Sequence, residues 1–229
     1  MGTGTENSVW VVVAAYNEAQ VIGQVVCDLI GCGYRVVVVD DGSTEATGPI
    51  SGAAGAVVVT HAVNLGQGAA LQTGIEFATR NGAETIVTFD ADGQHRAGDV
   101  AMLMEALAKT GADFALGSRF LGGATAMPHS RRMLLRAAIW FTRVTTGLQV
   151  TDTHNGLRAM TRDGASRIRL RQNRMAHASE LLETIARSGL RYVEVPVTIE
   201  YSAYSLAKGQ GLADSLKVLV DLSAHRLHR

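Results

Sequence analysis

The chain has 229 residues, of which 47% are hydrophobic, and this is enough to bury the core of one domain, or of one domain with a small appendage. Its 21 basic and 21 acidic residues give a formal net charge of zero, so no overall field favours nucleic acid, and no nucleic-acid partner is expected. Cys27 and Cys32 are the only cysteines, and their spacing fits neither a zinc site nor a disulfide framework, which predicts that both pack in the core. The sequence shows no signal sequence and no run of about 18 apolar residues, so we expect a cytoplasmic protein, soluble or peripherally attached to the inner face of the cell membrane.

Short apolar strands alternate with helical patterns along the first half of the chain. The strands are continuous β-branched runs, which is typical of strands buried on both faces of a sheet. The predicted strands cover 9–13, 36–39, 57–59 and 85–89, and the predicted helices cover 21–30 and 66–80. This order predicts right-handed β-α-β units, and therefore an α/β fold whose mostly parallel sheet carries helices on both faces.

Polar residues follow three of these strands at the point where each strand ends. They are Tyr16-Asn17-Glu18, Asp40-Asp41 and Asp90-Ala91-Asp92. In parallel sheets, ligands bind at the carboxyl ends of the strands beside a topological switch point. The three segments are therefore expected to meet at one edge of the sheet and to form a nucleotide and metal site.

Asp90 and Asp92 have the spacing of a metal clamp. Residues i and i+2 of a strand share a face, and two carboxylates about 4 Å apart would repel by about 4 kcal/mol at an effective dielectric constant near 20. A cation between them would remove that cost, and oxygen ligands suit Mg²⁺ or Mn²⁺. Gln94 could add a carbonyl oxygen, and His95 is a weaker candidate. The alternative is a solvated turn in which Gly93 supplies a positive φ.

Two other nucleotide-binding motifs are absent. In Gly66-Gln67-Gly68-Ala69-Ala70-Leu71 the last glycine of a dinucleotide-binding fingerprint is replaced by leucine, and the loop after the first strand carries no glycine. The chain also lacks the glycine-rich phosphate loop that ends in Gly-Lys-Ser/Thr. Dinucleotide-binding and phosphate-loop NTPase domains are therefore excluded.

The next elements bring an arginine to the same site. A helix is expected at 100–110, with Met102, Leu103, Ala106 and Leu107 facing inward. A strand at 113–116 then delivers Arg119, whose guanidinium suits a diphosphate because it binds phosphate oxygens in a bidentate fork. The segment 122–128 is rich in glycine and should interrupt the regular structure, so we divide a single domain into a nucleotide half (1–121) and an acceptor half (122–211).

The acceptor half contains further basic and polar segments. Ser130-Arg131-Arg132 opens a predicted helix that runs to about Thr146, and its cations could either meet phosphate or lie in solvent. The segment 152–158 is expected to form a polar turn in the wall of the site, ahead of another helix. A helix over 175–188 places His177 and Glu180 on one side, where they could instead form an exposed pair.

The end of the chain is expected to supply a strand, a loop and a helix. The strand covers 193–199, with Pro196 marking an edge or a bulge. The loop at 201–211 carries Lys208 and could close over bound phosphates. An amphipathic helix at 212–229 could pack on the domain, or dock on an anionic membrane surface or a membrane partner protein.

Five segments of the sequence carry a resemblance to a known family. They are Tyr16-Asn17-Glu18, the run from Val39 to Thr44, Asn64-x-Gly66-x-Gly68, the run from Phe89 to His95, and Gly117-Ser118-Arg119. Together they resemble family 2 glycosyltransferases, and most of all the dolichol- or polyprenyl-phosphate mannosyl- and glucosyltransferases and their bacterial polysaccharide-synthesis relatives. The chain has Ala14-Ala15 where the family commonly reads proline before its Tyr-Asn-Glu segment.

The resemblance implies a GT-A (Rossmann-like) fold and an inverting hexosyltransferase that uses a nucleotide-diphosphate sugar with Mg²⁺ or Mn²⁺. It also implies a role for each matching position. The nucleotide site would comprise Tyr16, Glu18, Val39, Asp41, Asp90 and Ala91, and the metal ligands would be Asp90, Asp92 and Gln94. The residues acting in catalysis would be Asp92, Arg119 and Arg131, of which the two arginines would act by contacting the phosphates. Lys208 would lie on a loop that closes over the bound nucleotide.

The acceptor is expected to be a lipid phosphate. Family members that act on a sugar hydroxyl usually carry an acidic pair as general base, and only Glu180 is found between 175 and 182. A phosphate is already an anion and needs no base, which favours transfer from a GDP-mannose- or UDP-glucose-type donor to polyprenyl phosphate. Two alternatives stay open: transfer to a sugar hydroxyl in polysaccharide or glycoside synthesis, with Glu180 or Asp152 as base, and a non-catalytic module that binds a nucleotide sugar or a membrane partner.

Overall fold

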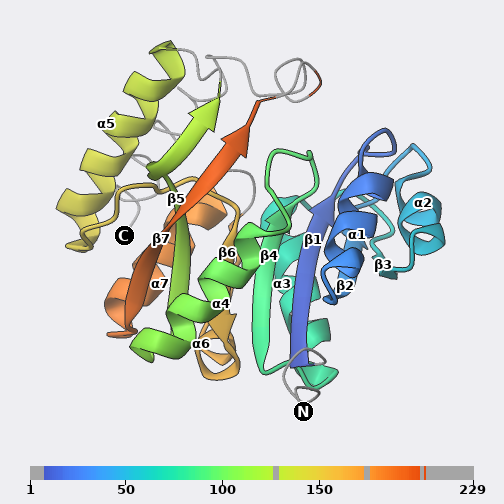
Figure 1. Cartoon of the computed structure of the whole chain (residues 1–229), viewed down its shortest axis with the longest axis horizontal. Coiled ribbons are helices and arrows are strands. Elements are labelled where there is room, and N and C mark those ends of the chain that lie inside the picture. Colours follow the sequence, from blue (N-terminus) through green and yellow to red (C-terminus); the bar gives the residue numbers. More distant parts are fainter. Residues whose placement is uncertain (1–7, 126–128, 173–175, 202–203, 205–229) are drawn as a thin grey trace.

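The described residues form a seven-stranded sheet with the strand order β3-β2-β1-β4-β6-β5-β7 (Figure 1). The computed structural model describes residues 8–125, 129–172, 176–201 and 204, with side chains for all of these except 124, 125, 130 and 131. The strands are β1 (Val9–Ala15), β2 (Arg35–Asp40), β3 (Val57–Thr60), β4 (Thr85–Asp90), β5 (Phe114–Thr125), β6 (Arg158–Thr161) and β7 (Tyr192–Glu200). β6 runs antiparallel to β4 and β5, and the other neighbouring strands are parallel. The expected mostly parallel α/β sheet is confirmed.

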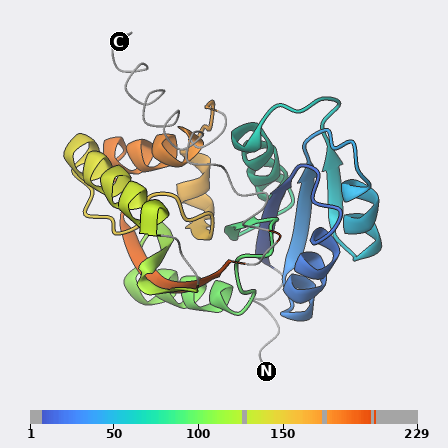
Figure 2. The same cartoon turned by 90° about the horizontal axis from the view of Figure 1, so that it is seen from above.

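Helices cover both faces of the sheet, as Figure 2 shows from above. They are α1 (Ile22–Gly31), α2 (Thr47–Ala53), α3 (Gln67–Arg80), α4 (Asp99–Thr110), α5 (His129–Thr146), α6 (Arg162–Ser166) and α7 (Ala176–Arg187). Successive residues of β1 point to opposite faces. Val11 and Val13 pack in a core cluster with α1 and α4, whereas Trp10 and Val12 pack in a second cluster with α3 and α7. A strand buried on both sides in this way needs apolar residues at every position, and the β-branched runs supply them.

The order of the strands places the site. The chain goes outward from β1 through β2 to β3, and then returns to pair β4 with the other side of β1. The sequence order therefore reverses between β1 and β4, and this is the switch point at which the strand ends diverge and leave room for a ligand.

Two predictions in the second half of the sheet were wrong. The segment from Gly122 was expected to interrupt the regular structure, but β5 continues to Thr125, with a register irregularity against β7 between Ser118 and Gly123. The proposed division at 121/122 falls within this strand, and the division itself stays a proposal. The polar turn at 152–158 was expected to precede a helix, but β6 comes first and inserts between β4 and β5 before the short helix α6. The expected edge position of the strand with Pro196 is confirmed, because β7 ends the sheet.

The burial of three side chains also differs from expectation. Cys27 and Cys32, expected in the core, are both exposed. Met102 of α4, expected to face inward, is 39% exposed, while Leu103 and Leu107 are buried as predicted. The short helix α2 was not predicted. Among the described helices, none combines the length and the apolar character needed to cross a membrane.

Candidate active site

The carboxyl ends of β1, β2 and β4 lie side by side, as the sequence predicts. In the strand register, Ala15 pairs with Asp40 and Ala14 pairs with Asp90. The polar segments that follow these strands therefore begin at one edge of the sheet.

Hydrogen bonds join the turn after β1 to the turn after β2. Asn17 has a left-handed backbone with φ of 54°, and its side-chain Oδ1 accepts from the backbone N–H of Thr44 at 2.9 Å. The backbone N–H of Asn17 donates to Ser43 Oγ at 2.9 Å, and that of Glu18 donates to Thr47 Oγ1 at 3.0 Å. The two segments that the resemblance assigns to the nucleotide are thus held as one unit.

Four positions expected at the nucleotide differ in their exposure. Tyr16 is 43% exposed, whereas the side chains of Val39 and Ala91 are buried, so these two could meet a nucleotide only through their backbone. The carboxylate of Glu18 accepts a hydrogen bond from the Tyr204 hydroxyl, with Oε2 2.8 Å from the phenolic oxygen. Their contacts with a nucleotide stay predictions.

Asp41 organises the loop before α3. Its buried carboxylate accepts hydrogen bonds from the backbone N–H groups of Leu65 at 2.9 Å and Gly66 at 2.7 Å, and it lies 2.7 Å from His61 Nδ1. The structure thus shows Asp41 fixing the 61–66 loop. Its predicted contact with the nucleotide is not tested by these bonds.

Asp90 is held from three sides at the end of β4. His95 Nε2 lies 3.0 Å from its Oδ2, and Gln67 Nε2 donates to its Oδ1 at 3.3 Å. The backbone passes so close at Gly156 that a Cβ there would lie 2.1 Å from Asp90 Oδ2. Burial raises the pKa of Asp90, but the hydrogen bond and charge of His95 and the charge of Arg158 outweigh it, so its pKa lies below the ordinary value. Asp90 is therefore a fixed anion.

The surroundings of Asp92 disfavour its ionised form. Burial and the neighbouring charge of Asp90 raise the pKa of Asp92 to about 6, although the backbone N–H of Gln94 donates to its Oδ1 at 3.1 Å. Among the residues that the structure describes, no group of three or more His, Cys, Asp or Glu side chains could hold a metal ion. Two carboxylates with one amide oxygen nevertheless fit Mg²⁺ or Mn²⁺, because such ions are commonly bound by one or two carboxylates and complete their shell with water and substrate phosphate.

Two buried polar atoms at this site have no hydrogen-bond partner in the described part of the chain. They are Nδ1 of His95, whose other ring nitrogen contacts Asp90, and Nδ2 of Asn155, which precedes the glycine packed on Asp90. A buried polar group without a partner costs about 1–3 kcal/mol. An ordered water or a bound ligand could supply the partner for either atom.

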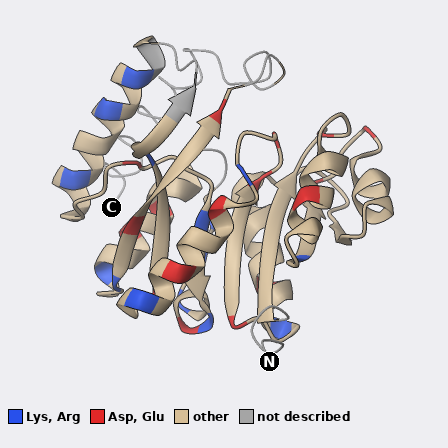
Figure 3. Ribbon diagram, viewed as in Figure 1, with Lys and Arg blue, Asp and Glu red and all other residues tan. Residues whose placement is uncertain are grey.

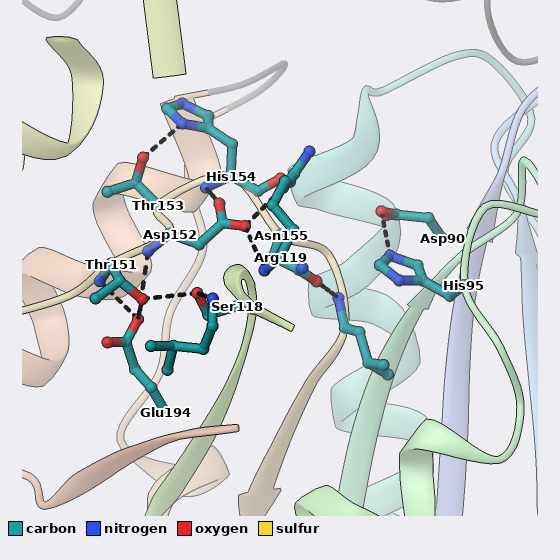
Figure 4. Close-up of polar contacts among 12 residues, drawn as sticks. Asp90, His95, Ser118, Arg119, Thr151, Asp152, Thr153, His154, Asn155 and Glu194 are labelled. Atoms are coloured by element: carbon teal, nitrogen blue, oxygen red, sulfur yellow. Dashed lines mark hydrogen bonds and ion pairs between the residues drawn. The ribbon is translucent and has the colours of Figure 1, made fainter. Parts of the chain in front are cut away.

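Arg119 lies in a buried network on the other side of the site (Figure 4). Its Nε donates to Asp152 Oδ2 at 2.6 Å, and the two side chains are 6% and 0% exposed. Its remaining nitrogens donate to the Tyr201 hydroxyl at 3.0 Å and to the backbone carbonyl of His154 at 2.9 Å. Described residues accept hydrogen bonds from three of the five N–H groups of this guanidinium, and the other two have no acceptor among them.

The charges in this network are set by burial and by pairing. Burial lowers the pKa of Arg119, but Asp152 and Tyr201 more than compensate, so its pKa is raised. Burial lowers the pKa of Arg158, and the charges of neighbouring carboxylates only partly offset this. Burial also lowers the pKa of His154 to about 4, so this imidazole is neutral at pH 7.

The segment 151–157 connects the two sides of the site. Asp152 contacts Arg119, and Gly156 passes over Asp90, so the segment lies against two of the residues predicted at the site. Thr151 fixes its start, since both its backbone N–H and its hydroxyl donate to Glu194 Oε1, at 2.7 and 3.0 Å. The density of polar residues in the sequence indicated this segment, but not the pairing of Asp152 with an arginine 33 residues away.

Glu180 lies on α7 and is engaged by the backbone of another segment. Its Oε2 accepts from the backbone N–H groups of Arg171 and Gln172, both at 2.9 Å. His177 is buried, so an exposed pair of His177 and Glu180 is not what the structure shows. Glu180 instead supports the 171–172 segment.

Several predicted residues lie outside the described residues. They are Lys208 and the segment 212–229. The helix that begins near Arg131 is confirmed as α5, but the side chain of Arg131 is not among those described. Their roles stay predictions.

The sequence matches the model of one protein family, described as glycosyl transferase family 2, over residues 10–169. The chain belongs to glycosyltransferase family 2. This confirms the resemblance carried by the strand-end motifs, and the protein is therefore a glycosyltransferase.

Similar curated proteins include both uncharacterised and assigned transferases. An uncharacterised protein of Methanocaldococcus jannaschii is 35% identical over 97% of this chain and 93% of its own length. A UDP-N-acetylglucosamine–dolichyl-phosphate N-acetylglucosaminyltransferase of Methanococcus voltae is 29% identical, covering 93% of this chain and 94% of its own. The polyprenol monophosphomannose synthase of Mycolicibacterium smegmatis is 29% identical, covering 88% and 80%.

Solved structures support the fold. Glucosyl-3-phosphoglycerate synthase of Mycobacterium tuberculosis, in complex with Mn²⁺, UDP-glucose and phosphoglyceric acid, superposes with a TM-score of 0.74 at 21% identity. The superposition covers 95% of this chain and 79% of that one. The predicted GT-A fold is thus confirmed.

Proposed function

We propose that this glycosyltransferase transfers a hexose, with inversion, from a nucleotide-diphosphate sugar of the GDP-mannose or UDP-glucose type to a polyprenyl phosphate at the inner face of the cell membrane. Relatives that span most of the chain are named as dolichyl-phosphate and polyprenol-phosphate sugar transferases, which supports this acceptor class.

The choice of a phosphate acceptor rests on one observation: the carboxylates of both candidate general bases, Asp152 and Glu180, are already bound by other groups of the protein. Asp152 is ion-paired with Arg119, and one carboxylate oxygen of Glu180 accepts two backbone hydrogen bonds. A carboxylate held in this way is a poor general base, because proton uptake would break the bonds that stabilise its charge. An acceptor phosphate needs no such base.

The residues at the strand ends would divide the remaining work. Asp90, Asp92 and Gln94 would hold Mg²⁺ or Mn²⁺, and this ion would neutralise charge that develops on the departing diphosphate. Arg119 would offer its two remaining N–H groups to phosphate oxygens from a guanidinium that its partners keep in one orientation. Arg131 is proposed to add a second cation.

A donor screen tests the proposal. Purified protein is incubated with Mg²⁺ or Mn²⁺, polyprenyl phosphate and each of a set of labelled GDP- and UDP-sugars. The expected product is organic-extractable and acid-labile, and its formation should be lost in Asp92→Asn and retained in the surface control Asp163→Asn. If no common donor gives such a product, the proposed reaction is wrong.

The acceptor class has its own test in Glu180→Gln. A glutamine oxygen can still accept the two backbone hydrogen bonds, so transfer to polyprenyl phosphate should stay within about threefold of wild type. A loss of 10²-fold or more, the range expected for a general base, would instead indicate a hydroxyl acceptor.

A further inference from the structure

The helix α5 exposes a row of large apolar side chains. Met133 is 75% exposed, Trp140 is 67% exposed and Val144 is 65% exposed. The spacings of seven and four residues place the three within about 40° of one another around the helix, at about 100° per residue. A set of large apolar side chains exposed on one face of a helix is uncommon on a surface that meets only water.

The opposite face of α5 is already used in the fold. Leu135, Ala138 and Thr142 are buried, and α5 packs against α7. The exposed stripe therefore cannot turn inward without giving up this packing. It is a second apolar face on a helix whose first face is already covered.

Arginines flank the stripe, and α5 itself carries no acidic residue. Arg132, Arg136 and Arg143 are all exposed and fall within about 40° of one another on one side of the stripe. The sequence contains no aspartate or glutamate between Asp113 and Asp152. Figure 3 shows positive charge distributed along the described part of α5 and no negative charge on it.

The position of α5 relates this surface to the site. The helix follows β5, the strand that carries Arg119, and begins at the end of the molecule to which the carboxyl ends of the strands point (Figure 1). A planar surface lying along α5 would thus extend toward the edge of the sheet where the site lies.

We propose that the exposed face of α5, formed by Met133, Trp140, Val144 and the three flanking arginines, docks on a membrane surface that contains anionic lipid. The apolar stripe would enter the boundary between headgroups and acyl chains, where tryptophan is favoured, while the arginines would reach lipid phosphates. A helix with this many exposed charges lies in the interface and does not cross it. The proposal extends the proposed function, because a polyprenyl phosphate is presented at such a surface, but it stands on the α5 surface alone.

Vesicle sedimentation tests the docking surface. The wild-type protein should co-sediment with phosphatidylcholine vesicles that contain about one third phosphatidylglycerol, and only weakly with phosphatidylcholine alone. Removing a surface cation lowers the partition coefficient about fivefold, so Arg132→Gln with Arg136→Gln should lower it about 25-fold. Trp140→Ser with Val144→Ser should lower it by a similar or larger factor.

Matched variants separate docking from folding and from charge alone. Arg80→Gln with Lys109→Gln removes the same charge from exposed positions on α3 and α4, and should change vesicle binding much less. All variants should unfold at the wild-type temperature in the absence of vesicles. Equal losses for the α5 pair and the control pair, or wild-type binding that does not depend on anionic lipid, would overturn the proposal.

Two further measurements distinguish the remaining outcomes. If the α5 variants dissociate a wild-type oligomer and vesicle binding is absent, the stripe covers a second copy of the chain and the membrane proposal is wrong. With a short, water-soluble polyprenyl phosphate, the variant with Trp140→Ser and Val144→Ser should transfer sugar at the wild-type rate, and only its transfer to vesicle-embedded acceptor should fall. Failure of the wild type with every soluble acceptor would overturn the proposed reaction while leaving vesicle binding intact.

Discussion

Replacing Asp152 by asparagine should destabilise the fold far more than its small change in shape suggests. The substitution leaves the guanidinium of Arg119 without its counter-charge in a site where the two side chains are 6% and 0% exposed. It also weakens the bonds that Asp152 accepts from the backbone N–H groups of Arg119 and His154, at 3.1 and 3.2 Å. Breaking a buried pair by removing one partner costs about 3–5 kcal/mol. For a chain of this size the midpoint of thermal unfolding should fall by roughly 6–20 °C.

Urea unfolding followed by circular dichroism measures this cost, and Glu200→Gln serves as the control. That variant breaks the pair between Arg96 and Glu200, whose side chains are 55% and 51% exposed, and it should cost at most about 1 kcal/mol. Adding Arg119→Met to Asp152→Asn should recover part of the loss, because no unpaired charge then stays buried. Equal costs for Asp152→Asn and Glu200→Gln would refute the assignment of a buried ion pair.

Three further predictions concern the site. Gly156→Ala places a Cβ 2.1 Å from Asp90 Oδ2 and should weaken Mn²⁺ binding, measured by titration calorimetry, about 10- to 100-fold. In the control Gly98→Ala a Cβ would meet no atom within 4 Å, so Mn²⁺ affinity should be unchanged, and equal affinities for the two variants would contradict the close approach at Gly156. Asp92→Asn should raise the free energy of unfolding in EDTA at pH 8 by about 1–2 kcal/mol, because burial and a neighbouring charge raise the pKa of this carboxyl to about 6 and so disfavour its ionised form. The same variant should lose the stabilisation that Mn²⁺ gives the wild type, and a variant less stable than the wild type in EDTA would contradict the raised pKa. Burial lowers the pKa of His154 to about 4, so this imidazole binds its proton more tightly in the unfolded chain, and wild-type stability should fall as the pH drops from 6.5 toward 4. Urea unfolding at several pH values should show a smaller decline for His154→Gln, and an unchanged decline would exclude His154 as its source.

The network around Arg119 also changes how this residue is understood. From the sequence it was expected only to contact phosphate. In the structure its hydrogen bonds connect β5 to the 151–157 segment and to Tyr201 after β7, so only part of its guanidinium is left for a ligand. Substitutions of Arg119 should therefore reduce stability and turnover together, and the two effects have to be measured side by side.

Local patterns were sufficient for the parts of the fold that depend on local sequence. Continuous β-branched runs predicted β1 and β2, and the apolar spacing of α7 predicted the burial of Leu181, Leu182 and Ile185. Parallel strands end at one edge, so the meeting of the polar strand ends followed from the order of the elements alone. The exposed cysteines show the limit of composition, because the side on which Cys27 lies depends on which face of α1 meets the sheet.

The sequence by itself determined the fold class, the family and the edge of the sheet at which the site lies, because each depends on periodicity and on short motifs. Only the tertiary structure decided which groups are paired there. β6 is four residues long and gains its hydrogen bonds from β4 and β5, so its own residues do not specify it. The pairing of Arg119 with Asp152, and the passage of Gly156 over Asp90, join residues 33 and 66 positions apart. These contacts form because β6 and the segment before it pack between β4 and β5, and no local sequence pattern predicts that packing.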